Sequence, residues 1–179
     1  MTEFIIRSPE EKDIEALAEL HFYMWNDFYK HCLPVEYSQK SYTLDQCRQK
    51  QLQMLEGIKD TDKEFALVAI DKKTDKLAAV CYINQNTPSG SDLYIPGFEL
   101  ELQRLYVWPE YRHKNLGGFL SYAVKKWAKQ HHYYSAFWWA IDQNPYGFIH
   151  GKRAKIVKQM QRDYAGTMLN LTAYGLEIV

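Results

Sequence analysis

The sequence predicts a single α/β domain built on a mixed sheet with helices on both faces. Helical patterns and β-rich runs are interspersed along the chain, and three consecutive β-rich runs are joined by turn-rich segments. A wholly apolar run then follows a helical pattern. At 179 residues and 46% hydrophobic composition, the chain can bury one core, so we treat residues 1–179 as one domain.

The first elements are a short strand and two helices. Residues 4–7 have the composition of a strand, and the segment SPEEKD after them offers a capping serine, an early proline and acids in the first turn. Apolar residues then recur at helical spacing, so we expect a helix that ends between Tyr29 and Pro34. A second helix is expected over residues 42–60, with Gly57 near its end.

The middle of the chain supplies the centre of the sheet. Residues 64–71, 76–85 and 98–108 have strand character and suit an antiparallel meander. A helix over residues 116–130 then leads to residues 133–142, an apolar run typical of a strand buried on both faces. Because a helix joins this strand to the strand before it, the two must run parallel, with the helix as a right-handed crossover.

The last part of the chain completes a sheet of about seven strands. Residues 144–162 are expected to form a further helix, which Gly147 and Gly151 weaken. Residues 163–171 and 173–179 are expected to be two final strands.

Composition excludes several classes of protein. Lys plus Arg and Asp plus Glu both total 22, so no excess of positive charge indicates a nucleic-acid partner. Cys32, Cys47 and Cys81 lack the spacing of a disulfide framework or a zinc site, so we expect no metal. Without a leader pattern or an apolar stretch of about 18 residues, we expect no membrane partner and a cytoplasmic location.

The stretch LYVWPEYRHKNLGGFL, residues 105–120, joins the strand that ends at Trp108 to the following helix. Gly117 and Gly118 let the backbone approach a ligand closely, and the first amides of the helix have no partner within it. With nearby cationic side chains, these amides form a site for phosphate or pyrophosphate. The alternative interpretation is a glycine-assisted turn surrounded by solvated charges.

This stretch resembles the pyrophosphate loop of the GNAT superfamily of acyl-CoA-dependent N-acyltransferases, which reads approximately V-x-P-x-x-R-x-x-G-x-G/A. Its positions are occupied here by Val107, Pro109, Arg112, Asn115 and Gly117. Asn115 replaces the usual glycine, and asparagine tolerates left-handed backbone angles better than most residues. The order of elements is also similar to that of the family over nearly the whole chain.

The resemblance implies a GNAT-like sheet that binds acetyl-CoA as cosubstrate, without a metal. The pantetheine arm would enter between the two central parallel strands, and the backbone of Leu105, Tyr106 and Val107 would bond its amides. The cofactor-binding residues implied in this way are Leu105, Tyr106, Val107, Arg112, His113, Lys114, Asn115, Leu116, Gly117, Gly118, Asn144 and His150. Of these, Asn144 takes the place of a family asparagine at the start of a helix, and His150 would lie beside the CoA.

The resemblance also suggests catalytic residues. A family glutamate lies six residues before the motif valine, and here that position is Glu101, the expected base for the acceptor amine. Glu99 alternates with it on the same strand face and could hold a cationic acceptor. The alternative is that both carboxylates belong to an exposed strand face. The family often has a tyrosine as general acid at the position of Gly151. Tyr146 and His150 are nearby substitutes, and we take Tyr146 as the candidate general acid, with a packing role as the alternative.

We therefore expect an acetyl-CoA-dependent N-acetyltransferase acting by direct attack of a primary amine on the thioester. The acceptor partner would be a small molecule or a peptide, and the protein a monomer or homodimer. Of the aromatic residues in HFYMWNDFY, residues 21–29, most would belong to the core and the others to a wall for the amine. The alternative, motivated by Asn115 and Gly151, is a non-catalytic GNAT-like domain with a CoA-binding or regulatory role.

Overall fold

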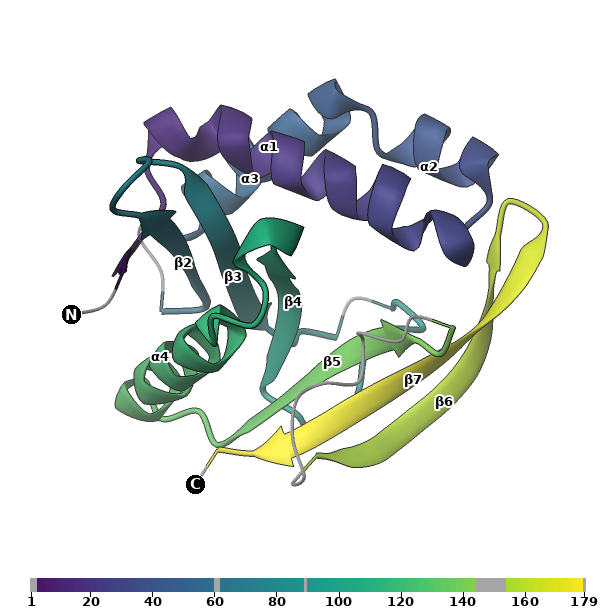
Figure 1. Cartoon of the computed structure of the whole chain (residues 1–179). Coiled ribbons are helices and arrows are strands. Elements are labelled where there is room, and N and C mark those ends of the chain that lie inside the picture. Colours follow the sequence, from purple (N-terminus) through teal and green to yellow (C-terminus); the bar gives the residue numbers. More distant parts are fainter. Residues whose placement is uncertain (1–2, 60–61, 89, 144–153, 179) are drawn as a thin grey trace.

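The fold is a seven-stranded mixed sheet with helices on both faces, seen in a computed structural model that describes residues 3–59, 62–88, 90–143 and 154–178 (Figure 1). The strand order is β1-β2-β3-β4-β5-β7-β6. The strands are β1 Phe4–Arg7, β2 Glu64–Asp71, β3 Leu77–Gln85, β4 Leu100–Val107, β5 Ser135–Ile141, β6 Lys155–Tyr164 and β7 Thr167–Glu177. The predicted fold class is confirmed.

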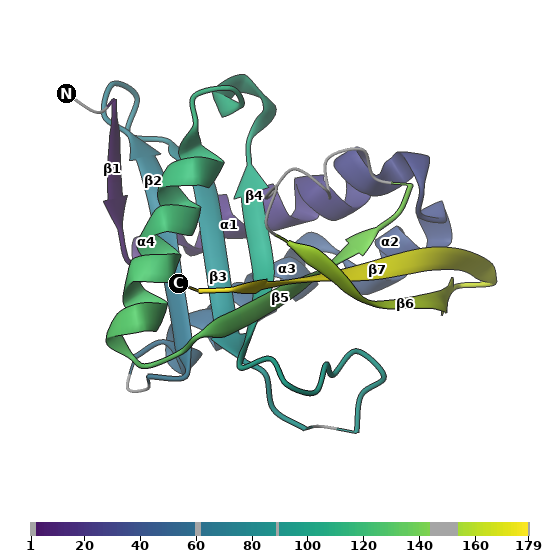
Figure 2. The ribbon, with the colours of Figure 1, turned by 90° about the horizontal axis from the view of Figure 1, so that it is seen from below.

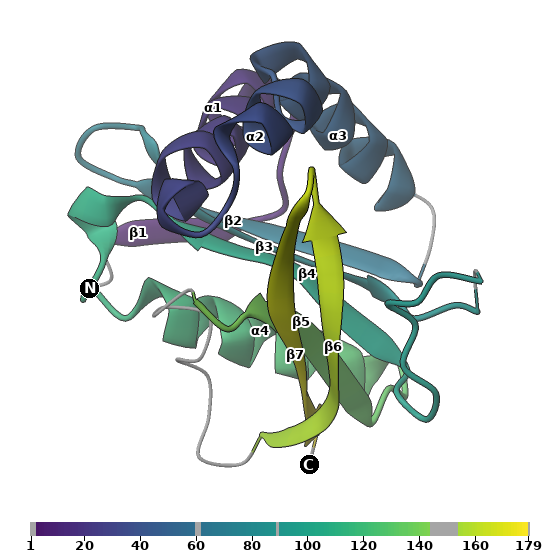
Figure 3. The same cartoon turned by 90° about the vertical axis from the view of Figure 1, so that its right-hand side faces the viewer.

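The helices form two layers around the sheet. They are α1 Ile14–Tyr23, α2 Val35–Ser41, α3 Leu44–Gly57 and α4 Leu116–Gln130, with a π-helical turn Met24–Phe28 after α1 and 3-10 turns at Glu11–Asp13, Tyr29–His31 and Pro109–Tyr111. Figure 3 shows α1, α2 and α3 above one face of the sheet and α4 below the other. In the described part of the chain, no helix is both long and apolar enough to span a membrane.

The side chain that caps the start of the first helical segment is Asp13, and not the predicted capping residue Ser8. Asp13 Oδ2 accepts a hydrogen bond of 2.8 Å from the backbone N–H of Glu10, and its carboxylate also pairs with Arg7 at the end of β1. The second long helix begins as its sequence suggests, because the Thr43 hydroxyl accepts from the N–H of Gln46.

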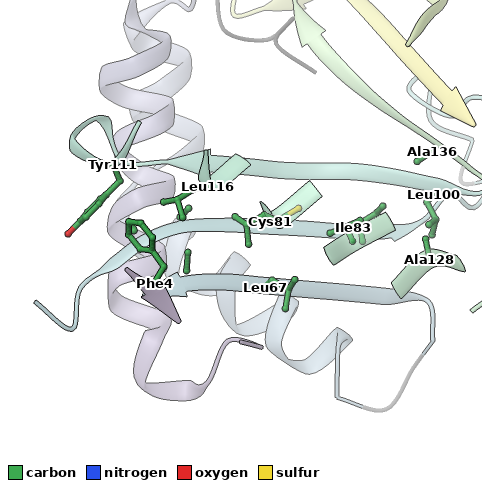
Figure 4. Close-up of a cluster of buried hydrophobic side chains, with 14 of the residues drawn as sticks. Phe4, Leu67, Cys81, Ile83, Leu100, Tyr111, Leu116, Ala128 and Ala136 are labelled. Atoms are coloured by element: carbon green, nitrogen blue, oxygen red, sulfur yellow. The ribbon is translucent and has the colours of Figure 1, made fainter. Parts of the chain in front are cut away.

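Two main cores hold the layers to the sheet. Beneath the sheet, Ile83 and Leu100 pack with Leu116 and Leu120 of α4, all of them almost completely buried (Figure 4). Above it, Leu17 and Leu20 of α1 and Met54 of α3 pack on the other face of the sheet. Their partners there include Val68 of β2 and Val80 of β3.

The predicted helix over residues 144–162 is wrong from residue 155 onward; residues 144–153 lie outside the described residues. Residues 155–164 form β6, which pairs antiparallel with β7 across a turn at Ala165 and Gly166. Both turn residues have positive φ, 52° and 87°, as a two-residue hairpin turn requires. Long Lys, Gln and Met side chains favour a helix locally, but hairpin pairing overrides that propensity. The two expected final strands are one continuous strand, β7.

The parallel contact between β4 and β5 is short. It consists of Leu100 opposite Ala136 and Glu101 opposite Phe137. Beyond these pairs the strands separate toward their carboxyl ends, as Figure 2 shows, and β5 continues into a curved sheet with β7 and β6. The separation opens the centre of the sheet.

Gly175 of β7 lies against Phe98, which belongs to the loop before β4. A Cβ at this position would overlap the Phe98 ring and lie 2.9 Å from Val157 Cγ1. We expect Gly175→Ala to destabilise the fold by roughly 1 to 3 kcal/mol through overpacking, measured by thermal or urea unfolding. In a Phe98→Leu background the smaller side chain should relieve most of this cost, and an equal cost in both backgrounds would contradict the explanation.

Candidate functional site

A cleft of about 610 Å³ opens where β4 and β5 separate. Its walls come from β4, the loop of residues 111–118, β5, the segments around the π-helical turn and α2, and the β6–β7 hairpin. The cleft therefore lies beyond the carboxyl ends of a parallel pair of strands, the usual place for ligands in open α/β sheets.

A β-bulge in β4 determines which side chains face the upper helices. Tyr82 of β3 pairs with Arg104, whereas its neighbour Ile83 pairs with Leu102, so Gln103 is an extra residue in β4. Side chains on either side of such a bulge change their alternation between the two faces.

The consequence is visible in the two cores. Leu100 and Leu102 before the bulge pack in the α4 core, as do Leu105 and Val107 after it. Glu101 lies between two residues of that core, so its side chain is directed toward the face covered by α1 and α3. After the bulge, Arg104 and Tyr106 share this face.

Glu101 is the carboxylate of the cleft. It is half-buried, and burial raises the pKa of its carboxyl group from its ordinary 4.5 to about 7. A group with such a pKa can both accept and release a proton near neutral pH. The negative charge of Glu101 also contributes to the raised pKa of Tyr82, behind burial and the hydrogen bond from Tyr82 to Glu64.

Glu99 does not join Glu101 in the cleft. Its Oε2 accepts hydrogen bonds from the backbone N–H groups of Tyr134 and Ser135, at 2.6 and 3.0 Å, and from the Ser135 hydroxyl at 3.2 Å. Glu99 is not among the described residues that line the cleft. Its contacts join the beginnings of β4 and β5, which is a structural position.

The loop before α4 carries an open helix N-terminus. His113 and Asn115 have left-handed backbone angles, with φ of 65° and 57°. Asn115 is the N-cap residue, yet its side chain makes no capping hydrogen bond, and the first turn of α4 holds no acid. The amides of Leu116, Gly117 and Gly118 are therefore available to an external anion.

Most of the cofactor residues expected from the sequence line this one cleft. They are Leu105, Tyr106, Val107, Arg112, His113, Asn115, Leu116, Gly117 and Gly118. Lys114 is not among them: its Nζ lies 3.2 Å from Glu3 Oε2, near the N-terminal strand. The expected residues Asn144, Tyr146 and His150 lie outside the described residues.

Aromatic side chains, most of which the sequence analysis did not single out, form the other end of the cleft. They come from distant segments: Trp25, Tyr29, Tyr37, Tyr42, Trp139 and Tyr164. Aromatic residues within 21–29 were expected to divide between core and wall, and Trp25 and Tyr29 are on the wall. The only sequence signal for the others was their residue type.

A buried polar network supports the wall from behind. Gln51 Nε2 lies 2.8 Å from His21 Nδ1, and Arg104 Nη1 donates a 2.9 Å hydrogen bond to Gln51 Oε1. Burial lowers the pKa of His21 to about 2, with smaller contributions from Arg104 and Lys50, so this imidazole is neutral. Among the described residues, no group of His, Cys, Asp or Glu side chains is placed to hold a metal ion.

Comparison with known proteins identifies the family. The model of the acetyltransferase (GNAT) family matches residues 22–146. The chain belongs to the GNAT acetyltransferase family. A search of curated protein sequences gave no match.

Solved structures share the GNAT fold over almost the full length of the chain. The PaiA N-acetyltransferase of Thermoplasma acidophilum, solved in complex with coenzyme A, has a TM-score of 0.66 and 20% identity over 97% of this chain and 98% of its own. YncA of Salmonella typhimurium, a putative acetyltransferase solved with its cofactor acetyl-CoA, has a TM-score of 0.66 and 16% identity. The match covers 99% of this chain and 95% of YncA. A GCN5-related N-acetyltransferase of Kribbella flavida has a TM-score of 0.71 and 14% identity, and the match covers 98% of each chain.

The raised pKa of Glu101 gives this GNAT protein a pH-dependent stability. Between the ordinary pKa of 4.5 and the folded pKa of about 7, the folded state holds the proton more tightly, so stability falls as pH rises. Glu101→Gln cannot ionise and should be more stable than the parent protein above pH 7, by up to about 3 kcal/mol. Urea unfolding across this pH range tests it; a difference that does not change with pH would contradict it.

Proposed function

We propose that this protein is an acetyl-CoA-dependent N-acetyltransferase that acts on a primary amine of a small molecule or peptide. The observation that carries the proposal is that Glu101, with a pKa near 7, lines the same cleft as the open N-terminus of α4. One end of the cleft suits an anionic cofactor, and the buried carboxyl group suits proton transfer.

The residues of the cleft fit CoA in two respects. The unblocked amides of Leu116 to Gly118 and the nearby guanidinium of Arg112 suit a pyrophosphate. Beyond Glu101, β4 has no paired partner on its β5 side within the described residues, so the backbone there can bond the pantetheine amides. We keep Asn144 and His150 as further proposed CoA contacts. When bound, acetyl-CoA supplies a thioester carbonyl open to attack.

Glu101 supplies the base, directly or through a water molecule. An amine with a pKa near 10.4 is neutral only about once in 10³ molecules at pH 7, a deficit of roughly 4 to 5 kcal/mol. A carboxyl group with a pKa near 7 is about half ionised at that pH and can take the proton. The amine nitrogen bonds to the acyl carbon, the carbon–sulfur bond breaks, and the CoA thiolate leaves.

The cysteines favour direct transfer over an acyl-cysteine intermediate. Burial raises the pKa of the Cys32 and Cys47 thiols and that of Cys81 to about 12. None of these three cysteines is among the described residues that line the cleft. A thiol held neutral and away from the cleft is a poor nucleophile for the thioester.

The departing thiolate has a proposed proton donor in Tyr146. Because a CoA thiol is much more acidic than an alcohol, the thiolate can also leave without a dedicated donor, so Gly151 at the usual tyrosine position is compatible with transfer. Asn115, the other departure from the family motif, has the left-handed conformation that a glycine would adopt. The loop geometry therefore gives no support to the non-catalytic alternative.

Acetyl-CoA should raise the Tm of the protein, and Gly117→Arg should remove this effect, because a long side chain would occupy the space for the pyrophosphate. Asn115→Gly is the matched control: it relaxes the left-handed backbone and should keep the shift. Thermal unfolding with and without acetyl-CoA measures both. No shift of the parent protein at millimolar ligand would count against the acyl-CoA site.

Glu101→Gln should reduce kcat by roughly 10² to 10⁴, the usual contribution of a general base, with little change in CoA affinity. Much of the activity should return at high pH, where the amine deprotonates unaided. Thiol release with a panel of amines, beside calorimetry with CoA, provides the measurement. Near-normal kcat at neutral pH would exclude Glu101 as the base, and tight CoA binding without turnover would favour the non-catalytic alternative.

A further inference from the structure

We propose that the acceptor is a monoamine with an aromatic body, whose amine lies at Glu101 and whose ring lies among the aromatic side chains of the cleft. This inference rests on the proposed function, since it names the substrate class of the same site. It distinguishes the acceptor from polyamines and from peptides rich in basic residues.

The aromatic end of the cleft is built from rings that pack on one another. Trp25 and Tyr42 are stacked with ring centroids 4.0 Å apart and an angle of 2° between their planes. Tyr37 lies edge-on to Tyr164, with centroids 4.9 Å apart, and 6.2 Å from Tyr42. Trp25, Tyr37 and Tyr42 are half-buried and line the cleft. A flat apolar ligand can add a further ring to this arrangement.

The position of Trp25 is fixed from both sides. It lies in the π-helical turn, a geometry that often occurs at functional sites. Its Nε1 donates a 3.1 Å hydrogen bond to the Tyr106 hydroxyl on β4, so the aromatic wall is tied to the strand that carries Glu101. Glu101 and Tyr106 share the upper face of that strand. A ligand that extends along the cleft from the aromatic end can therefore present its amine to the carboxylate.

The charges around the cleft favour one positive group on the acceptor and disfavour a second. Glu101 is the one acidic residue among the described residues that line the cleft, whereas Arg104, Arg112 and Arg162 line it as well. Arg104 bonds Gln51, and Arg112 belongs to the proposed phosphate site.

Arg162 has no such assignment. It lies on β6 at the hairpin side of the cleft, where its charge acts on the nearby Tyr164. In the part of the chain that the structure describes, its side chain makes no hydrogen bond or ion pair. Lys50 Nζ lies 3.7 Å from the centre of the Tyr42 ring, so a cation already occupies a face of this aromatic system. A second ammonium group on the acceptor would meet like charge at this end.

Three amines separate the effect of an aromatic ring on the acceptor from the effect of a second ammonium group. They are 2-phenylethylamine, hexylamine and 1,6-diaminohexane, where the last two differ only in the distal ammonium group. Thiol release gives kcat/KM for each, and calorimetry on the CoA complex gives the binding constant of each amine. We expect both kcat/KM and the association constant to be about tenfold higher for 2-phenylethylamine than for 1,6-diaminohexane. The values for hexylamine should lie between the two.

Two variants test the roles proposed for Arg162 and Tyr37. Arg162→Glu should raise kcat/KM for 1,6-diaminohexane by about fivefold or more, because it reverses the charge at the hairpin side of the cleft. It should leave kcat/KM for 2-phenylethylamine unchanged. Tyr37→Leu should raise KM for 2-phenylethylamine by a similar factor and leave hexylamine unchanged. Tyr122→Leu is the matched control, since Tyr122 is 72% exposed on α4 and is not among the residues lining the cleft; it should change neither.

The outcomes separate this inference from the proposed function. Equal or better turnover of 1,6-diaminohexane would overturn the aromatic monoamine and leave the transferase standing. No turnover with any amine, together with preferential binding of 2-phenylethylamine, would overturn the transferase and support the ligand assignment. Absence of both binding and turnover of 2-phenylethylamine, or the same effect from Tyr122→Leu as from Tyr37→Leu, would overturn the inference.

Discussion

The site depends on how little of β4 is paired with β5. Two residue pairs, Leu100 with Ala136 and Glu101 with Phe137, hold the parallel strands together before they separate. The contacts of Glu99 with Tyr134 and Ser135 reinforce this junction just before the pairs. Because the junction is tight at one end and open at the other, the sheet stays continuous across seven strands while its centre offers unpaired backbone to a ligand.

The bulge at Gln103 determines the chemistry of the opening. If Gln103 took a regular place in the pairing, Arg104 and Tyr106 would fall on the face opposite Glu101, and the link from Trp25 to β4 would be lost. Because Gln103 is extra, Glu101 and Tyr106 share the face covered by the upper layer, where partial burial raises the pKa of Glu101. The same packing that completes the core thus supplies a group able to exchange protons at neutral pH.

Local patterns predicted the parts of this protein that depend on local sequence. The run from Val107 to Gly117 indicated the loop, and the crossover indicated the parallel strands, because both follow from residues close together in the chain. Residues 155–162 were wrongly predicted as helix, since only pairing with β7 stabilises them as a strand. The aromatic wall was largely missed, because Tyr37 and Tyr164 meet only after the sheet has curved.

The π-helical turn Met24–Phe28 suggests how this cleft can diverge between relatives. A π-helical turn holds one residue more than an α-helical turn, so deletion of a single codon here can convert it to regular helix. The residues beyond the turn would stay nearly in register, because the wider turn had absorbed the extra residue. Such a change would alter the side chains that the turn itself presents to the cleft, Trp25 among them, in one genetic step while β4, the loop before α4 and both cores keep their sequence.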